Sequence, residues 1–298
     1  MYILHPIRRM RALLLFLLLV PCLSAPALEL RAGTAKAVIT PDLDVERIGV
    51  MGEPLEGVNH DIYVRVLVLN DGDRRLVIAT YDLNCLDVAT PILRVRLRDE
   101  LGIDPAYFIP LATHNHAAPI QIVPDNFDYG RRLADITFET VQQAIENEQG
   151  PVRLRFGSGY CYFLKAVGNA PVDYEVQVLE VAGQEGPVAV FFNHPTHPLQ
   201  VDYNKVGIGH PGYAVEVVEA MMPGAMALYG DACGGNQFTV RGMQASNETV
   251  QTLAEELADV VHEVCEGNMQ DVTGPLSSRL EVISLPLADP LPYEDAKK

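Results

Sequence analysis

The chain has 298 residues, enough for one large domain or two modest ones, and its 48% apolar content supports a substantial core. A formal net charge of −17 without any basic stripe excludes a nucleic-acid-binding protein, because the phosphate backbone would repel such a surface. No internal repeat, linker or low-complexity stretch interrupts the sequence, which predicts one continuous domain.

The first 27 residues resemble an export signal in composition. A basic stretch from Arg8 to Arg11 precedes an apolar run at 12–20 that is too short to span a bilayer, and residues 25–27 read Ala-Pro-Ala, a cleavage pattern. We therefore expect residues 1–27 to be a signal peptide and the mature protein to be secreted or periplasmic, with no transmembrane span. That segment carries three arginines and no acidic residue, so the mature chain has a net charge of −20. Cys22 offers lipoprotein anchoring as the alternative, but Pro21 before it fits that signal poorly, and we favour soluble export.

Apolar, β-branched runs predict strands at 64–69, 76–81, 107–111, 152–156, 174–181, 188–192, 226–229 and 280–285. Helical periodicity appears after Asp128, which can cap that helix, again after Pro211, and from Ser246 to near Gly267. Strands and helices interleave without a strict βαβ rhythm, which predicts an α/β fold with a mixed β-sheet core flanked by α-helices. Nothing after residue 285 reads as a closing element, so we expect residues 28–298 to be a catalytic domain truncated at its C-terminus.

The remaining cysteines are Cys85, Cys161, Cys233 and Cys265, widely spaced and without a CxxC pair. This spacing argues against a zinc ribbon. In an exported protein, disulfides and buried free thiols both remain open.

Two histidine clusters follow predicted strands. His114 and His116 come after strand 107–111, and His194 and His197 come after strand 188–192. Histidines at i and i+2 on an extended segment point the same way, so both imidazoles of the first cluster can serve one centre. Zinc binds imidazole nitrogen and accepts ligands distant in sequence, so two paired clusters favour a metal site over histidines that only cap turns.

Two acidic residues also follow predicted strands: Asp82 after 76–81 and Asp231 after 226–229. Such a carboxylate can orient a ligand histidine, act as a general base, or cap the next turn, and the sequence leaves these roles open. No G-x-S-x-G motif is present, so a serine-triad hydrolase of the α/β-hydrolase type is not supported.

Short segments in a fixed order extend this pattern along nearly the whole mature chain, at residues 32–41, 63–69, 82–83, 113–116, 172–176, 187–198, 211–214 and 230–236. In this order they resemble the neutral/alkaline non-lysosomal ceramidase family. The resemblance implies hydrolysis of an N-acyl amide of a sphingolipid-like substrate, which can be presented at a membrane surface, by one zinc ion per chain that activates water. It places zinc on His114 and His197, the latter through its position between Asn193 and Pro198, and sets His116 beside the metal to contact substrate or stabilise the oxyanion.

The sequence departs from the family pattern at three places. A segment that carries a serine in ceramidases reads Gly-Gly-Asn-Gln-Phe at 234–238, and an aspartate before the Pro-Gly-Tyr block is replaced by Gly209, with His210 alongside. The resemblance also implies two further metal ligands, a glutamate and a tyrosine, in a C-terminal portion that this sequence does not contain. Asp82, Asp231 and His210 are therefore candidate supporting residues of the metal. The alternatives are a zinc hydrolase of another amide, ester or lactone, and a non-catalytic binding module of the same fold.

Overall fold

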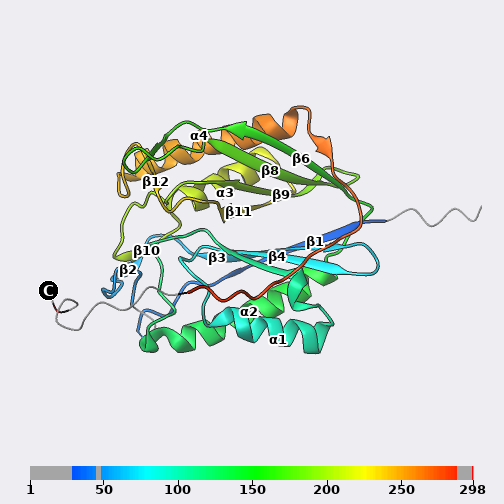
Figure 1. Ribbon diagram of the computed structural model, residues 1–298, viewed down its shortest axis with the longest axis horizontal. Helices are drawn as coiled ribbons and strands as arrows, with labels where there is room; N and C mark the ends of the chain where they lie inside the picture. Colours follow the sequence, from blue (N-terminus) through cyan, green and yellow to red (C-terminus); the bar gives the residue numbers. More distant parts are fainter. Residues whose placement is uncertain (1–28, 45–47, 287–296, 298) are drawn as a thin grey trace, which may run out of the picture.

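Two β-sheets face each other in the computed structural model, and helices cover the outer face of each sheet (Figure 1). The structure describes residues 29–44, 48–286 and 297. The predicted signal peptide, including Cys22, lies outside this range. The four-layer arrangement confirms the predicted α/β class with mixed sheets in a single domain.

The first sheet is built from the N-terminal half in the order β1-β3-β4-β5. Its strands are β1 (Arg31–Val38), β3 (Tyr63–Asn70), β4 (Arg75–Tyr81) and β5 (Phe108–Ala112). Only the β4–β5 pair of this sheet is parallel, because helix α1 (Ala89–Leu101) connects these two strands. Helix α2 (Phe127–Glu146) packs beside α1 and over β1 and β3.

The second sheet follows in the order β11-β9-β8-β6-β13. Its strands are β6 (Arg153–Tyr160), β8 (Glu175–Ala182), β9 (Pro187–His194), β11 (Met226–Asp231) and β13 (Gln270–Asp271). Helix α3 (Gly209–Met221) makes the crossover between the parallel strands β9 and β11, and α4 (Asn247–Glu266) packs against α3, β6 and β8. Short elements complete the chain: β2 (Gly57–Val58) with β10 (Lys205–Val206), β7 (Leu164–Ala166) with β12 (Gln237–Thr239), and the 3-10 turns η1 (Pro105–Tyr107) and η2 (Pro124–Asn126).

Side chains that alternate between the two faces of each strand form three apolar clusters, one between each pair of adjacent layers. In β3, Val64, Val66 and Val68 face the helices α1 and α2, whereas Leu67 and Leu69 face the second sheet. The same alternation in β8, β9 and β11 sends one set of side chains toward α3 and α4 and the other toward the first sheet. Because both faces of each sheet are buried, the strands read as nearly continuous apolar runs, which is why their positions are visible in the sequence.

The first seven predicted strands and the three predicted helices are present. Ser246 caps α4 as predicted, since its side chain accepts a hydrogen bond from the Thr249 N–H. Asp128 does not cap α2: it lies in the first turn, and Asn126 occupies the cap position without a side-chain hydrogen bond to the helix. The predicted helix after Pro211 begins two residues earlier, at Gly209.

Three further outcomes concern β1, α1 and the predicted strand at 280–285. Strand β1 and helix α1 were not predicted from the sequence. Strand β1 consists mostly of small residues and so shows no apolar β-branched run, and α1 alternates apolar residues with arginines, which obscures the helical period. The strand prediction at 280–285 is wrong: the segment forms no strand, and Val282 is 92% exposed.

The four cysteines after residue 28 are free thiols, which decides between the disulfides and the free thiols that the sequence left open. No helix in the described part of the chain is long and apolar enough to cross a membrane.

The contact between β1 and α2 depends on Gly33, and a substitution there tests it. A Cβ atom at residue 33 would lie 1.9 Å from the Ala144 carbonyl oxygen, so Gly33→Ala must push strand and helix apart. We expect it to lower the free energy of unfolding by about 1–3 kcal/mol, measured by urea denaturation. Gly274→Ala, where a Cβ meets nothing within 4 Å, is the matched control and should leave stability within about 0.5 kcal/mol. Equal stability of the two variants would contradict the packing described here.

Candidate metal centre

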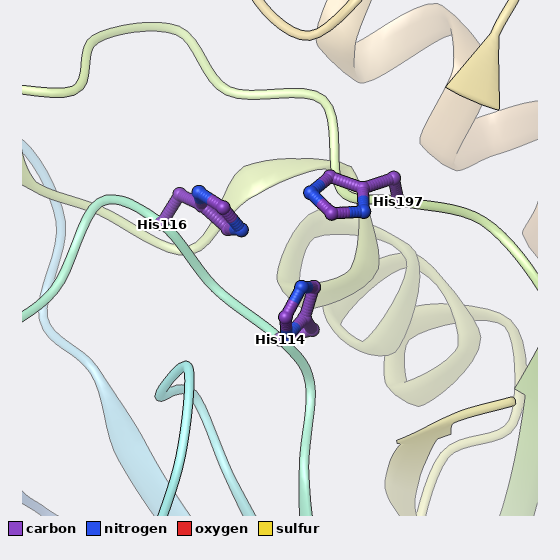
Figure 2. A group of neighbouring side chains, drawn as sticks. All are labelled: His114, His116 and His197. Carbon is purple, nitrogen blue, oxygen red and sulfur yellow. The ribbon is translucent and has the colours of Figure 1, made fainter. Parts of the chain in front are cut away.

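Three histidines meet where strands of the two sheets end. His114 and His116 lie in the loop that follows β5 of the first sheet, and His197 lies in the segment that follows β9 of the second sheet (Figure 2). Each of these strands has a parallel partner, so the carboxyl ends of two strands meet at each side of the site. Ligand sites of α/β proteins gather at such carboxyl ends.

The three imidazoles form a nearly equilateral triangle. The ring centroids of His114 and His197 are 4.7 Å apart, and His116 lies 4.9 Å from each of them. One nitrogen from each ring lies within 4.8 Å of the others, a grouping that can hold a metal ion. The rings stand edge-to-face or tilted toward one another, and Figure 2 shows them directed into a shared space. The sequence prediction that brought His114 and His197 to one centre agrees with this placement.

The protonation of the cluster suits a metal. Both ring nitrogens of His116 and Nδ1 of His197 are buried and have no hydrogen-bond partner. Burial, reinforced by the neighbouring imidazoles His114 and His197, lowers the pKa of His116 to about 4, and burial beside His114 also lowers the pKa of His197. Neutral imidazoles with free lone pairs are the form in which histidine binds metals. Buried polar nitrogens without partners are rare in folded proteins, so a ligand for this cluster satisfies an otherwise costly arrangement.

His114 reaches the cluster through an unusual backbone conformation. Its φ is 58°, in the left-handed region, and the loop from Thr113 to His116 is not an extended strand. The reason given from the sequence, that alternate residues of a strand point the same way, is therefore wrong, although the two rings do meet. A non-glycine residue in this conformation costs about 1–2 kcal/mol, and such strain is concentrated at functional sites.

The loop is held by Asn115, a residue that the sequence analysis passed over. Asn115 is buried, and its side-chain Nδ2 donates to the carbonyl oxygens of Asp82 (2.9 Å) and Gly207 (2.6 Å), while its Oδ1 accepts from the Ala117 N–H. Its own N–H donates to the Leu83 carbonyl. Four hydrogen bonds at one buried residue fix the loop between His114 and His116, so both rings are positioned before any ligand arrives.

Asp82 supports this loop, but its carboxylate does not contact the histidines. Its Oδ2 accepts from the Tyr63 N–H and from Arg65 Nη1, both at 2.9 Å, and both side chains of the Asp82–Arg65 ion pair are buried. The expected role of Asp82 in orienting a ligand histidine stays a prediction; in the structure its backbone carbonyl accepts a hydrogen bond from Asn115, the residue between the two histidines. The general-base role is not supported, because the carboxylate is already committed to a cation.

His197 is held from the opposite side by the segment around β12. Its N–H donates to the Gln237 carbonyl at 2.8 Å, and its ring lies 4.9 Å from the Phe238 ring. A Cβ atom at Gly234 would lie 3.1–3.2 Å from the backbone of Thr196 and His197 and from Asp231 Oδ1. Glycine at 234 therefore allows the segment between β11 and β12 to pass close to the backbone of His197.

The other two histidines of interest lie in the core behind the site. His194 is buried with its nitrogens engaged, Nδ1 at 2.5 Å from Thr196 Oγ1 and Nε2 at 3.4 Å from the Cys161 carbonyl, and it lies outside the triangle. His210 is fully buried, which lowers its pKa to about 3, and its Nδ1 accepts from the Leu199 N–H. His210 thus supports the site indirectly, by holding the chain two residues beyond His197.

Asp231 remains a titratable group without a committed role. It ends β11 directly opposite His194 in the parallel pair with β9, and its Oδ1 is buried without a hydrogen-bond partner. Burial raises the pKa of its carboxyl to about 7. Asp231 Oδ1 and the His197 backbone nitrogen both lie against Gly234. A carboxyl group that titrates near neutral pH beside the histidine cluster suits proton transfer.

Two residues beside the triangle were also missed from the sequence. Asn84 Nδ2 lies 3.3 Å from His114 Nδ1, and the Tyr203 ring lies 6.2 Å from the His116 ring with its hydroxyl donating to the Met243 carbonyl. A polar partner on one imidazole nitrogen fixes which nitrogen faces a metal. Asn84 comes three residues after the end of β4, and this place near a strand end was the one feature of the sequence that could have marked it as a site residue.

Comparison with known proteins shows the fold. No protein-family model matches the chain, and no curated protein sequence matches it. Among solved structures, the neutral ceramidase from Pseudomonas aeruginosa is similar, with a TM-score of 0.72 and 18% identity over 83% of this chain and 46% of that chain. A ceramidase complexed with C2 is similar to the same degree, with a TM-score of 0.72 and 19% identity over 83% of this chain and 45% of that chain. This chain thus spans less than half the length of either structure, and it shares their fold.

The ion pair beneath the His114 loop gives a testable consequence. Asp82→Asn leaves Arg65 as a buried, uncompensated charge, so we expect the free energy of unfolding to fall by about 3–5 kcal/mol. Asp73→Asn, in the exposed turn between β3 and β4, is the matched control and should change stability by less than about 0.5 kcal/mol. Denaturant titration of both variants measures the difference. An Asp82→Asn protein as stable as its control would show that the pair does not hold this loop.

Proposed function

We propose that the chain is an exported, zinc-dependent hydrolase that cleaves the amide bond of a lipid-like acyl amide. The observation that carries this proposal is the triangle of His114, His116 and His197, in which both ring nitrogens of His116 and Nδ1 of His197 are buried without a protein partner. The ceramidase-like fold supports the reaction class, and the signal-like composition of residues 1–27 supports export.

Zinc is the metal that this ligand set fits best. Neutral imidazole nitrogen suits zinc, and catalytic zinc sites commonly combine three protein ligands with one open position. A zinc ion so bound supplies a Lewis acid and activates water at neutral pH. His116 lies as close to each of the other two rings as they lie to each other, so we assign it as a third ligand in addition to His114 and His197.

The protein's own groups have separate tasks in this scheme. Asn115 and the Asp82–Arg65 pair fix the loop that presents His114 and His116, and Gln237 fixes the backbone of His197. Asp231, with a pKa raised to about 7, is the group suited to take up a proton and return it to the leaving amine.

One observation favours a substrate other than ceramide itself. At the segment where ceramidases carry a serine, Gln237 is engaged in structure: its Oε1 accepts from the Asp173 N–H and its Nε2 donates to the Cys233 carbonyl. Without a hydroxyl group there, an amide with a different polar part, or an ester or lactone, is the second candidate. A binding module that retained the fold would need none of the metal chemistry, so metal content separates it from both enzymes.

Metal analysis of histidine variants tests the ligand assignment. The purified wild-type protein should hold about one zinc ion per chain, and His114→Ala, His116→Ala and His197→Ala should each weaken zinc binding more than about 100-fold, since loss of a second-shell partner alone costs 10–100-fold. His262→Ala, on α4, is the matched control and should bind zinc like the wild type. Isothermal titration with zinc measures all four. If His116→Ala retains tight zinc, His116 is not a ligand and returns to the role of contacting substrate.

Hydrolysis of an acyl amide tests the reaction. A fluorogenic long-chain N-acyl amide should be cleaved by the zinc-loaded protein, cleavage should stop after chelation, and added zinc should restore it. An ester of the same acyl chain, assayed in parallel, distinguishes the second candidate. A protein that binds zinc stoichiometrically but cleaves neither bond would contradict the proposed activity.

A further inference from the structure

A pocket lies beside the loop that carries His114 and His116. It has a volume of about 250 Å³ and is formed where the segment 200–209 meets the beginnings of α3 and α4. Ala117, the residue after His116, lines one wall, and the Gly207 N–H donates to the Ala117 carbonyl. The pocket therefore adjoins the loop that carries the candidate metal ligands but is built from a different set of side chains.

Gln200 provides the feature that points to a ligand. Its side chain is buried at this pocket, and neither Nε2 nor Oε1 has a hydrogen-bond partner. Its backbone is fixed, since its N–H donates to the Met243 carbonyl and its carbonyl accepts from the Ala245 N–H. A buried carboxamide that makes none of its hydrogen bonds costs free energy, and a polar ligand would recover it.

Gly209 determines where the Gln200 amide lies. A Cβ atom at residue 209 would be 2.7 Å from both Nε2 and Oε1 and 2.9 Å from Cδ, so the amide group packs directly against this glycine. Gly209 also has a φ of 59°, which favours glycine.

The charges at the pocket are already paired. His60 Nε2 lies 3.0 Å from Glu216 Oε1, and hydrogen bonding to Glu216 raises the pKa of His60 to about 9, so this pair persists at neutral pH. Asp202 Oδ2 lies 3.7 Å from Lys205 Nζ. With no uncompensated charge among its lining groups, the pocket favours a neutral ligand.

The remaining lining groups suit hydroxyl groups and a ring. A carboxamide presents a donor and an acceptor side by side, and a pair of adjacent hydroxyl groups, each both donor and acceptor, can satisfy the two together. Tyr213 adds an aromatic ring to the wall, its hydroxyl donating to Asn247 Oδ1 at 3.2 Å, and Asn59 adds an amide that, unlike that of Gln200, is exposed. We propose that this pocket binds a neutral polyhydroxylated ring, of the sugar or cyclitol class, next to the metal centre.

Binding can be tested on the metal-free 298-residue protein, so its outcome does not depend on the proposed hydrolysis. The probe is myo-inositol, titrated into ¹⁵N-labelled protein while the backbone amide signals of Gly209 and Asn247 are followed by NMR. We expect saturable shifts of both signals. Cyclohexanol, which keeps the ring but has a single hydroxyl group, should cause smaller shifts without saturation.

Gln200→Met retains the length of the side chain but removes the amide, so we expect at least about tenfold weaker binding of myo-inositol. Gln143→Met, at an exposed position on α2, is the matched control and should bind like the wild type. If Gln200→Met does not fold, Asn247→Ala at the exposed rim replaces it and should weaken binding severalfold. The proposal is overturned if myo-inositol gives no saturable shifts, if cyclohexanol or acetamide binds as well, or if the folded Gln200→Met protein retains wild-type affinity.

Discussion

The site depends on one buried asparagine that joins the two halves of the molecule. Asn115 Nδ2 donates both to the Asp82 carbonyl, at the end of β4 in the first sheet, and to the Gly207 carbonyl, just before α3 of the second half. The Asp82 carbonyl is buried and the Gly207 carbonyl is partly buried, so losing these bonds would leave poorly solvated backbone groups without a partner. The loop between His114 and His116 cannot move without releasing them. His114 and His116 are thus tied to the half of the chain that carries His197.

The sequence predicted those features that arise from local pattern. Buried strands are recognisable in the sequence as apolar runs. His114 and His197 follow such runs, so both could be assigned to the ends of strands. The carboxyl ends of strands from two sheets then bring distant residues together. In contrast, the left-handed conformation of His114 arises from hydrogen bonds to the ends of neighbouring strands, and no local pattern encodes it.

Supporting residues were harder to assign for a related reason. Asp82 was chosen because it follows a strand, yet its carboxylate is held by Arg65, whose position two residues into β3 gave no sign of this pairing. Gln200 was not singled out at all, because an amide in a polar segment is ordinary until its neighbours are known. Its lack of partners is a property of the tertiary structure alone. The C-terminal segment at 280–285 shows the converse, since an apolar alternating pattern formed no strand where no sheet edge receives it.

The triangle of imidazoles joins the two sheets, because His114 and His116 follow a strand of the first sheet and His197 follows a strand of the second. The distances between the three rings therefore depend on how the two sheets are aligned. Leu67 and Leu69 of one sheet belong to the same buried apolar cluster between the sheets as Val188 and Leu228 of the other. A slide of one sheet across that layer would alter the spacing between His197 and the His114–His116 pair before it disturbed either pair of outer helices. The electronic spectrum of a cobalt ion held by the three rings would therefore report inter-sheet movement directly. The geometry of the three histidines and the packing of the two sheets are therefore coupled in this fold.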